Sequence, residues 1–106
     1  MLPIAATAFV LGGCGGGGSV SLAKLAANQD AYLGKRVTTT GTVEVQTNTN
    51  HSRYYVLADR AQDLVILTPA RIAHRYVGTH VTVTGRFAFD ARAGRLIRIE
   101  RIAASD

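Results

Sequence analysis

Two stretches of the chain alternate apolar and polar residues, a pattern typical of half-buried β-strands. The first covers residues 37–46, and one of its faces carries Val37, Thr39, Gly41, Val43 and Val45. The second covers residues 81–90, and its corresponding face carries Val81, Val83, Gly85, Phe87 and Phe89. Because successive side chains of a strand point to opposite faces, each set shares one face of its strand, and Phe87 and Phe89 are predicted to lie in the core.

Both strands belong to a unit that occurs twice in the chain. Residues 32–41 read YLGKRVTTTG and residues 76–85 read YVGTHVTVTG, with six of the ten positions identical. Each copy predicts a helix end, a glycine suited to a left-handed turn, and a strand with a second glycine at a bend or bulge. Tyr32 and Tyr76, which open the two copies, are expected to close the ends of a barrel.

The remaining elements are shorter. Ser21 is predicted to cap a short N-terminal helix. Thr68 and Pro69 predict the start of a second helix, with Thr68 as the N-cap and Pro69 in the first helical position, and this helix ends near Tyr76. Three further strands are predicted over residues 54–58, 64–67 and 96–102. Polar, turn-forming residues join the strands at 47–52, 59–63 and 90–95.

The predicted order is a helix, three strands, a helix and two strands. This is the layout of an all-β fold with small helices added, namely a five-stranded Greek-key barrel with a helix between strands three and four. Two tandem ββα-like repeats in a small sandwich are the alternative, and the unequal contents after the two copies argue against it. Residues 21–103 resemble bacterial OB-fold domains, particularly the small tRNA-anti-like domains. Their first strand carries the pattern Tyr-x-Gly-Lys-x-Val-x-x-x-Gly, which residues 32–41 match.

The N-terminal stretch has the order of a secretory signal peptide: a short apolar run over 4–11 followed by small residues. Residues 11–14, Leu-Gly-Gly-Cys, resemble the lipobox of bacterial lipoproteins. The resemblance implies a signal peptide over residues 1–13, a lipid-carrying Cys14, and an extracytoplasmic location at a bacterial membrane. Residues 14–20 are then a glycine-rich tether. Residues 1–3 lack the usual positive charge of a signal peptide, which is consistent with a translation start upstream of Met1.

The net charge of +5 favours anionic partners. Ten arginines and two lysines face seven acidic residues, but the arginines are spread along the chain rather than clustered. A dispersed, solvated surface charge therefore competes with a functional basic face as the interpretation.

The OB-fold resemblance implies that ligands lie across strands two and three, between the loops 47–53 and 90–95. Such sites use aromatic side chains for stacking and cations for phosphate or other anions. Only one of Tyr54 and Tyr55 can be exposed, because adjacent residues of a strand face opposite ways. The exposed ring is either a stacking platform or an incidental surface tyrosine, and the other belongs to the core. The candidate cations are Arg53, Arg86, Arg92 and Arg95.

Catalytic and metal chemistry have little support in the sequence. The histidines at 51, 74 and 80 have no metal-ligand spacing, and no nucleophile is flanked by a base and an orienting acid. We therefore expect no cofactor and no enzymatic activity. The sequence favours a membrane-anchored envelope lipoprotein whose OB-fold domain binds a protein or a small anionic ligand. The alternative is a single-stranded oligonucleotide-binding module, which the location outside the cytoplasmic membrane disfavours.

Overall fold

A computed structural model of the chain describes residues 19–105. The predicted signal peptide, Cys14 and residues 15–18 of the predicted tether lie outside this range. The described elements are helices α2 (Leu22–Ala27) and α3 (Gln29–Tyr32), strands β2 (Arg36–Thr47), β3 (Arg53–Ala58) and β4 (Leu64–Thr68), helix α4 (Ala70–Ala73) with the 3₁₀ turn η1 (His74–Tyr76), and strands β5 (His80–Asp90) and β6 (Gly94–Ala104).

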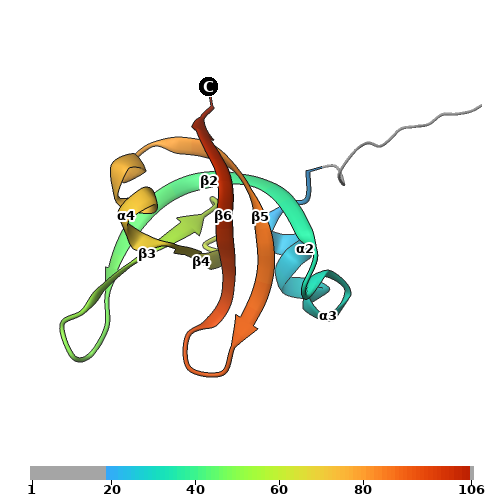
Figure 1. Cartoon of the computed structure of the whole chain (residues 1–106), viewed down its shortest axis with the longest axis horizontal. Helices are drawn as coiled ribbons and strands as arrows, with labels where there is room; N and C mark the ends of the chain where they lie inside the picture. The colour runs from blue at the N-terminus through green and yellow to red at the C-terminus, as the bar shows by residue number, and fades with distance from the viewer. Residues whose placement is uncertain (1–18, 106) are drawn as a thin grey trace, which may run out of the picture.

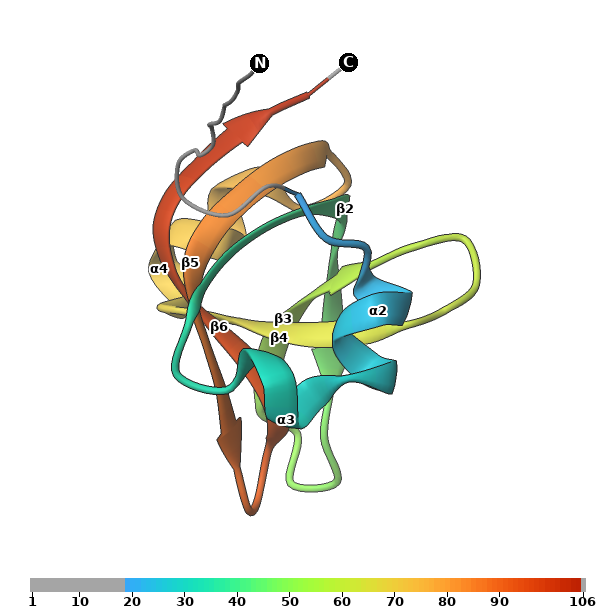
Figure 2. The ribbon, with the colours of Figure 1, turned by 90° about the vertical axis from the view of Figure 1, so that its right-hand side faces the viewer.

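The five strands form one sheet that closes into a ring in the order β2-β3-β4-β6-β5 and back to β2 (Figures 1 and 2). Neighbouring strands are antiparallel except β4 and β6, which run parallel. Strand β2 is long enough to serve two neighbours: its first half pairs with β5 and its second half with β3. Helix α4 connects the third and fourth strands along the chain. The predicted β-rich fold of five strands and few short helices is therefore confirmed.

The core fills the interior of the ring. The alternating faces predicted for the two long strands supply much of it, with Val37, Val43, Val81 and Phe87 almost inaccessible to solvent. Helix α2 adds Leu22 and Leu25, and Tyr32 and Tyr76 are partly buried against the same cluster. Helices α2 and α3 lie on one side of the ring and α4 on the other (Figures 1 and 2). The core is thus a single hydrophobic cluster shared by every strand.

Two apolar residues on these alternating faces are exposed, and one of them, Phe89, was predicted to lie in the core. Val45 and Phe89 have the inward phase of their strands, yet they are 44% and 51% exposed. Strand β2 loses its pairing with β5 after Thr42, so the end that carries Val45 pairs only with β3. Phe89 lies opposite Arg95 near the tip of the β5–β6 hairpin, before β6 begins to pair with β4 at Leu96. In both places the hairpin extends past the ring, so its inner face has no strand across from it.

The helix starts agree with the sequence prediction in one case of two. The Ser21 hydroxyl accepts a hydrogen bond from the Lys24 backbone N–H at 3.0 Å, which makes Ser21 the N-cap of α2 as predicted. The prediction for α4 is wrong: Pro69 is its N-cap, and Thr68 is the last residue of β4, where it pairs with Arg98. The backbone of Thr68 is used for the parallel pairing with β6, so the residue is in the sheet and does not cap the helix.

Gly41 and Gly85 are required because neighbouring backbone lies where a side chain would be. A Cβ atom at Gly85 would come within 2.1 Å of the Arg98 carbonyl oxygen, and one at Gly41 within 2.8 Å of the Ala58 carbonyl oxygen. The β5–β6 register also shifts between Thr84 and Gly85, which confirms the predicted irregularity at the second glycine. At each position the ring is too tightly curved to admit even a methyl group.

Replacing Gly85 by alanine is expected to lower the free energy of unfolding by about 3 kcal/mol or more, because strand β5 or β6 must move to remove the overlap. Gly41→Ala should cost less, since its closest approach is longer. Thr40→Ala, on an exposed position of β2, is the control and should stay within about 0.5 kcal/mol of the parent. Chemical denaturation measures all three. Parent-like stability for Gly85→Ala would contradict the tight curvature at this strand.

Candidate binding groove

The outer face of β3 and β4 is hollowed between the β2–β3 and β5–β6 loops. Two adjoining hollows, of about 270 and 370 Å³, share Tyr54, Ile66 and Ala93. We call them together the outer groove. Its lining residues come from the β2–β3 loop, β3, β4 and the β5–β6 hairpin: Asn48, Tyr54, Val56, Leu64, Ile66, Phe89, Arg92, Ala93, Gly94 and Arg95.

The floor of the outer groove is apolar, although it lies on the side of the sheet that faces away from the core. Strand alternation sends Tyr55, Leu57, Val65 and Leu67 inward, and therefore turns Tyr54, Val56, Leu64 and Ile66 outward. A sheet with one solvated face normally presents polar residues there. Val56 is nevertheless only 1% exposed, because the surrounding side chains cover it. The two strands thus bury apolar residues on both faces, and the outward set forms a surface suited to a ligand.

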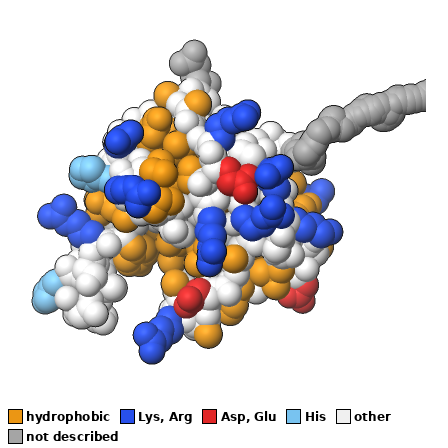
Figure 3. Space-filling model, in the orientation of Figure 1, with side chains coloured by type: hydrophobic (Ala, Val, Ile, Leu, Met, Phe, Trp, Pro, Cys, Tyr) orange, Lys and Arg blue, Asp and Glu red, His pale blue; other side chains and the backbone are white. Residues whose placement is uncertain are grey.

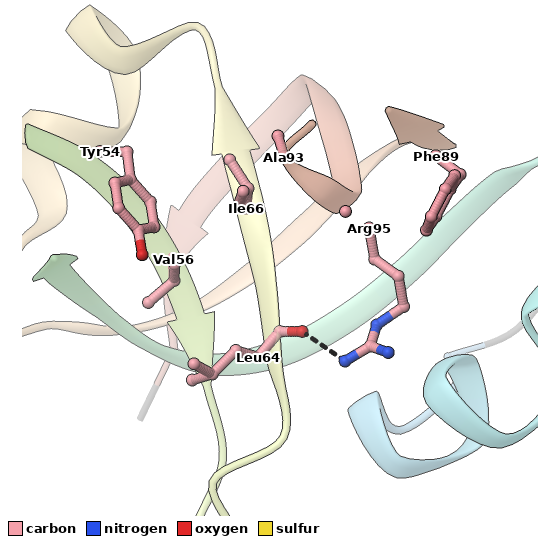
Figure 4. Close-up of a pocket in the computed structure, with 8 residues that line it drawn as sticks. Tyr54, Val56, Leu64, Ile66, Phe89, Ala93 and Arg95 are labelled. Carbon is pink, nitrogen blue, oxygen red and sulfur yellow. Dashed lines mark hydrogen bonds between the residues drawn. The ribbon is translucent and has the colours of Figure 1, made fainter. Parts of the chain in front are cut away.

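Two aromatic rings border this floor. Tyr54 lies on β3 and Phe89 projects from β5, with Ile66 on the strand between them and the two rings on different sides of the hollow (Figure 4). Tyr55 has a different environment: it is buried, and its hydroxyl forms a 3.0 Å hydrogen bond with His74 Nδ1. Of the two adjacent tyrosines, Tyr54 is therefore the aromatic residue of the groove, and Tyr55 is a core residue.

The β5–β6 turn places two guanidinium groups at the groove. Arg95 donates from Nη2 to the Leu64 carbonyl oxygen at 3.1 Å, which fixes its side chain against the start of β4 (Figure 4). Arg92 is exposed on the turn and lines the second hollow. Asp90 holds the turn, because its Oδ1 accepts hydrogen bonds from the backbone N–H groups of Ala93 and Arg92. These bonds lower the pKa of Asp90 below its usual value, since they favour the ionised carboxylate.

The other two predicted arginines lie elsewhere. Arg86 is on the outer face of β5, and its Nη1 donates to the Gly34 carbonyl oxygen at 3.1 Å. Arg53 begins β3 next to Tyr54, so its side chain leaves the opposite side of the strand, and it does not line either hollow. The structure therefore brings together Tyr54, Arg92 and Arg95 of the predicted set, and separates Arg53 and Arg86 from them.

Phe89 is the groove residue that the sequence prediction missed. Its inward phase on β5 indicated the core, but its position beside the 90–95 turn places it beyond the ring. Its closeness to that turn was the available signal, because the end of a long hairpin extends past the strands on the far side of the ring. The remaining lining residues were not predicted individually, although all lie in strands or loops that the OB-fold resemblance indicated: Asn48, Val56, Leu64, Ile66, Ala93 and Gly94.

The groove offers apolar contact, aromatic faces and positive charge. Within residues 19–105, no group of three or more His, Cys, Asp or Glu side chains is placed to hold a metal ion. Among the described helices, none is both long and apolar enough to span a bilayer. What the groove can do with the residues present is bind a ligand that combines an apolar or ring-shaped part with a negative charge.

Comparison with known proteins does not assign the groove a ligand: no protein-family model matches the chain, and no curated protein matches it in sequence. Its role is therefore inferred from its own geometry.

Proposed function

We propose that this protein is a bacterial envelope lipoprotein, anchored through Cys14, whose domain is a non-catalytic OB-fold binding module. Its ligand is a protein segment or a small anionic molecule, and the outer groove is its binding site. The observation that carries the proposal is the groove itself: apolar residues on the outward face of β3 and β4, bordered by Tyr54, Phe89, Arg92 and Arg95.

The strand order supports the OB-fold assignment. Numbered along the chain from β2, the ring runs one-two-three-five-four and returns to one, with a helix between the third and fourth strands. Five strands with this helix are the layout of the partly open Greek-key barrel that defines the OB fold. The groove also coincides with the face that this fold uses, between the loop joining strands one and two and the loop joining strands four and five.

The chemistry of the groove supports the ligand class. An apolar floor gives affinity by removing surface from water, and the two aromatic rings suit a flat or branched apolar group. The Arg92 and Arg95 guanidinium groups are matched by a carboxylate or phosphate, which they can bind in a bidentate way. A short peptide with an acidic residue and a small organic anion both meet these requirements.

The proposed anchor explains how such a domain is held at a membrane. Cys14 precedes Ser19, the first described residue, by five positions. Five residues span at most about 18 Å, so acyl chains on Cys14 would keep the domain close to the bilayer. Two or more chains are needed for firm attachment, which matches the acylation pattern of the lipoprotein family that the lipobox resembles.

Cys14→Ser is expected to move the protein from the membrane fraction to the soluble fraction of a bacterial host, because no thiol remains to carry the lipid. Ser19→Ala, a change of similar size outside the lipobox, is the matched control and should stay in the membrane fraction. Cell fractionation with immunoblotting measures both, and circular dichroism establishes that each variant is folded. A Cys14→Ser protein that stays membrane-bound would refute the anchor.

A second function, binding of single-stranded nucleic acid, is favoured by one observation. Tyr54 and Phe89 border the same hollow as Arg95, with Arg92 beside it, and aromatic platforms with cations are what single-strand binders use. The proposed location argues against it, since little nucleic acid is present outside the cytoplasmic membrane.

Titration with a single-stranded DNA oligonucleotide at low and high salt separates the two functions. The favoured proposal predicts no tight binding even at low salt. Nucleic-acid binding would instead appear as tight association that weakens steeply with salt, and Tyr54→Ala and Phe89→Ala would each weaken it by about 1–3 kcal/mol. Val77→Ala, at an exposed apolar residue outside the groove, is the control. Tight binding lost only in the groove variants would make nucleic acid the ligand.

A further inference from the structure

A row of arginines crosses the outer surface of β2, β5 and β6, away from the outer groove. In the strand register, Arg36 of β2 lies opposite Arg86 of β5, and Arg86 lies opposite Arg98 of β6. The three side chains therefore stand side by side on neighbouring strands. Arg101 adds a fourth cation three residues beyond Arg98 on β6, opposite Thr84. All four residues are exposed. Figure 3, which views the molecule with β5 and β6 in front, shows several Lys and Arg side chains over these strands.

These arginines are only partly neutralised. Arg36 Nε lies 2.6 Å from Glu100 Oε1, and this is the one ion pair that the described residues form. Arg86 donates a hydrogen bond to the Gly34 carbonyl oxygen. This oxygen carries no net charge, so the charge of Arg86 is not neutralised. The Cβ atoms of residues directly opposite each other in a sheet are roughly 5 Å apart, and like charges at such positions are destabilising. The sheet thus holds uncompensated positive charges in register, an arrangement that an external anion would relieve.

The chain enters the domain beside this row. Ser19 and Val20, which were predicted to belong to the tether, run along β2. Ser19 forms a bridge with Thr38, and the Val20 N–H donates to the Thr38 carbonyl oxygen at 2.8 Å. Thr38 in turn shares a 2.9 Å hydrogen bond with Thr84, the strand partner of Arg101. The attachment point therefore lies on the same part of the ring as the arginines, and Cys14 is at most about 18 Å from Ser19.

We infer that Arg36, Arg86, Arg98 and Arg101 form a docking surface for the anionic phospholipid headgroups of the bilayer that anchors the protein. The inference rests on the proposed anchor at Cys14, which fixes the side of the domain nearest the membrane. Charge complementarity identifies the occupant, because basic side chains next to a lipid anchor are attracted to the negative surface potential of a bilayer. A lipid chain and a basic patch together hold a protein more firmly than one chain alone.

Docking in this way orients the outer groove. In the ring order β2-β3-β4-β6-β5, the centre of the arginine row is β5, and the strands across the ring from β5 are β3 and β4. The outer groove lies on the outward face of these two strands. With the row against the headgroups, the groove faces away from the bilayer, where a ligand or partner protein can reach it.

Vesicle binding by the full chain carrying Cys14→Ser isolates this surface from the anchor. The probes are vesicles of pure phosphatidylcholine and vesicles in which about a third of the lipid is phosphatidylglycerol. We expect binding to the anionic vesicles that weakens with salt. Adding Arg98→Gln and Arg101→Gln together should weaken it by about thirtyfold, at the usual attraction per arginine near an anionic surface. Neither residue donates a side-chain hydrogen bond within the described part of the chain, so the fold should tolerate the changes.

The matched control is Arg60→Gln with Arg71→Gln, which removes the same charge from the β3–β4 turn and from α4. It should change binding by no more than about threefold, because its positions lie away from the row. Residues 1–18 are the same in every variant, so their contribution cancels, and the phosphatidylcholine vesicles measure it directly. Circular dichroism establishes that both double variants are folded.

Several results would overturn the inference. Equal losses in the two double variants would mean that net charge alone drives binding. Equal binding to the two kinds of vesicle would mean that the headgroup charge is not recognised. Unchanged vesicle binding, together with a loss of single-stranded DNA binding in Arg98→Gln/Arg101→Gln, would assign the row to nucleic acid.

The experiments distinguish a failure of the proposed anchor from a failure of the proposed docking surface. If the amount of protein in the membrane fraction does not depend on Cys14, the anchor is refuted. If vesicle binding is nevertheless lost in Arg98→Gln/Arg101→Gln, the affinity of the row for anionic lipid is supported. Cys14-dependent retention without binding to anionic vesicles would refute the docking surface alone.

Discussion

The parallel pairing of β4 with β6 is the constraint on which the rest of the structure depends. It joins Ile66, Leu67 and Thr68 to Leu96, Ile97 and Arg98, and it is the contact that turns an open sheet of antiparallel strands into a ring. Parallel neighbours need a long crossover, and here α4, η1 and β5 supply it. Closure encloses the core, and it curves the sheet so tightly that Gly85 has no space for a side chain.

The closed ring carries two surfaces of different character. It brings the β5–β6 hairpin next to β4, where Phe89 and Arg95 border the apolar face of β3 and β4. On the other side of the ring, the antiparallel pairings of β5 with β2 and β6 place Arg36, Arg86 and Arg98 in one row. Because β5 lies across the ring from β3 and β4, the two surfaces face different ways. From this arrangement we propose that one side of the domain binds the membrane surface and the other side binds a ligand.

The sequence predicted the elements well because their signals are local. Alternation placed Phe87 in the core, and the Ser21 cap was predicted from neighbouring residues. It failed where the outcome depends on distant strands. Alternation tells which face a residue occupies but not whether a strand lies across the ring from it, so Phe89 was wrongly assigned to the core. Thr68 was expected to cap a helix because its pairing with Arg98, thirty positions away, is not visible locally.

For the same reason, the groove was indicated only in outline. Adjacent Tyr54 and Tyr55 could not be told apart without the sheet's orientation, and Arg86 was grouped with residues from which the ring separates it. The measurement that tests closure most directly is NMR in solution, using nuclear Overhauser contacts between strands. A closed ring predicts contacts joining residues 66–68 of β4 to residues 96–98 of β6, together with slow amide exchange in both strands. Hairpin contacts for β2–β3 and β5–β6 without any β4–β6 contact would show an open sheet and refute closure.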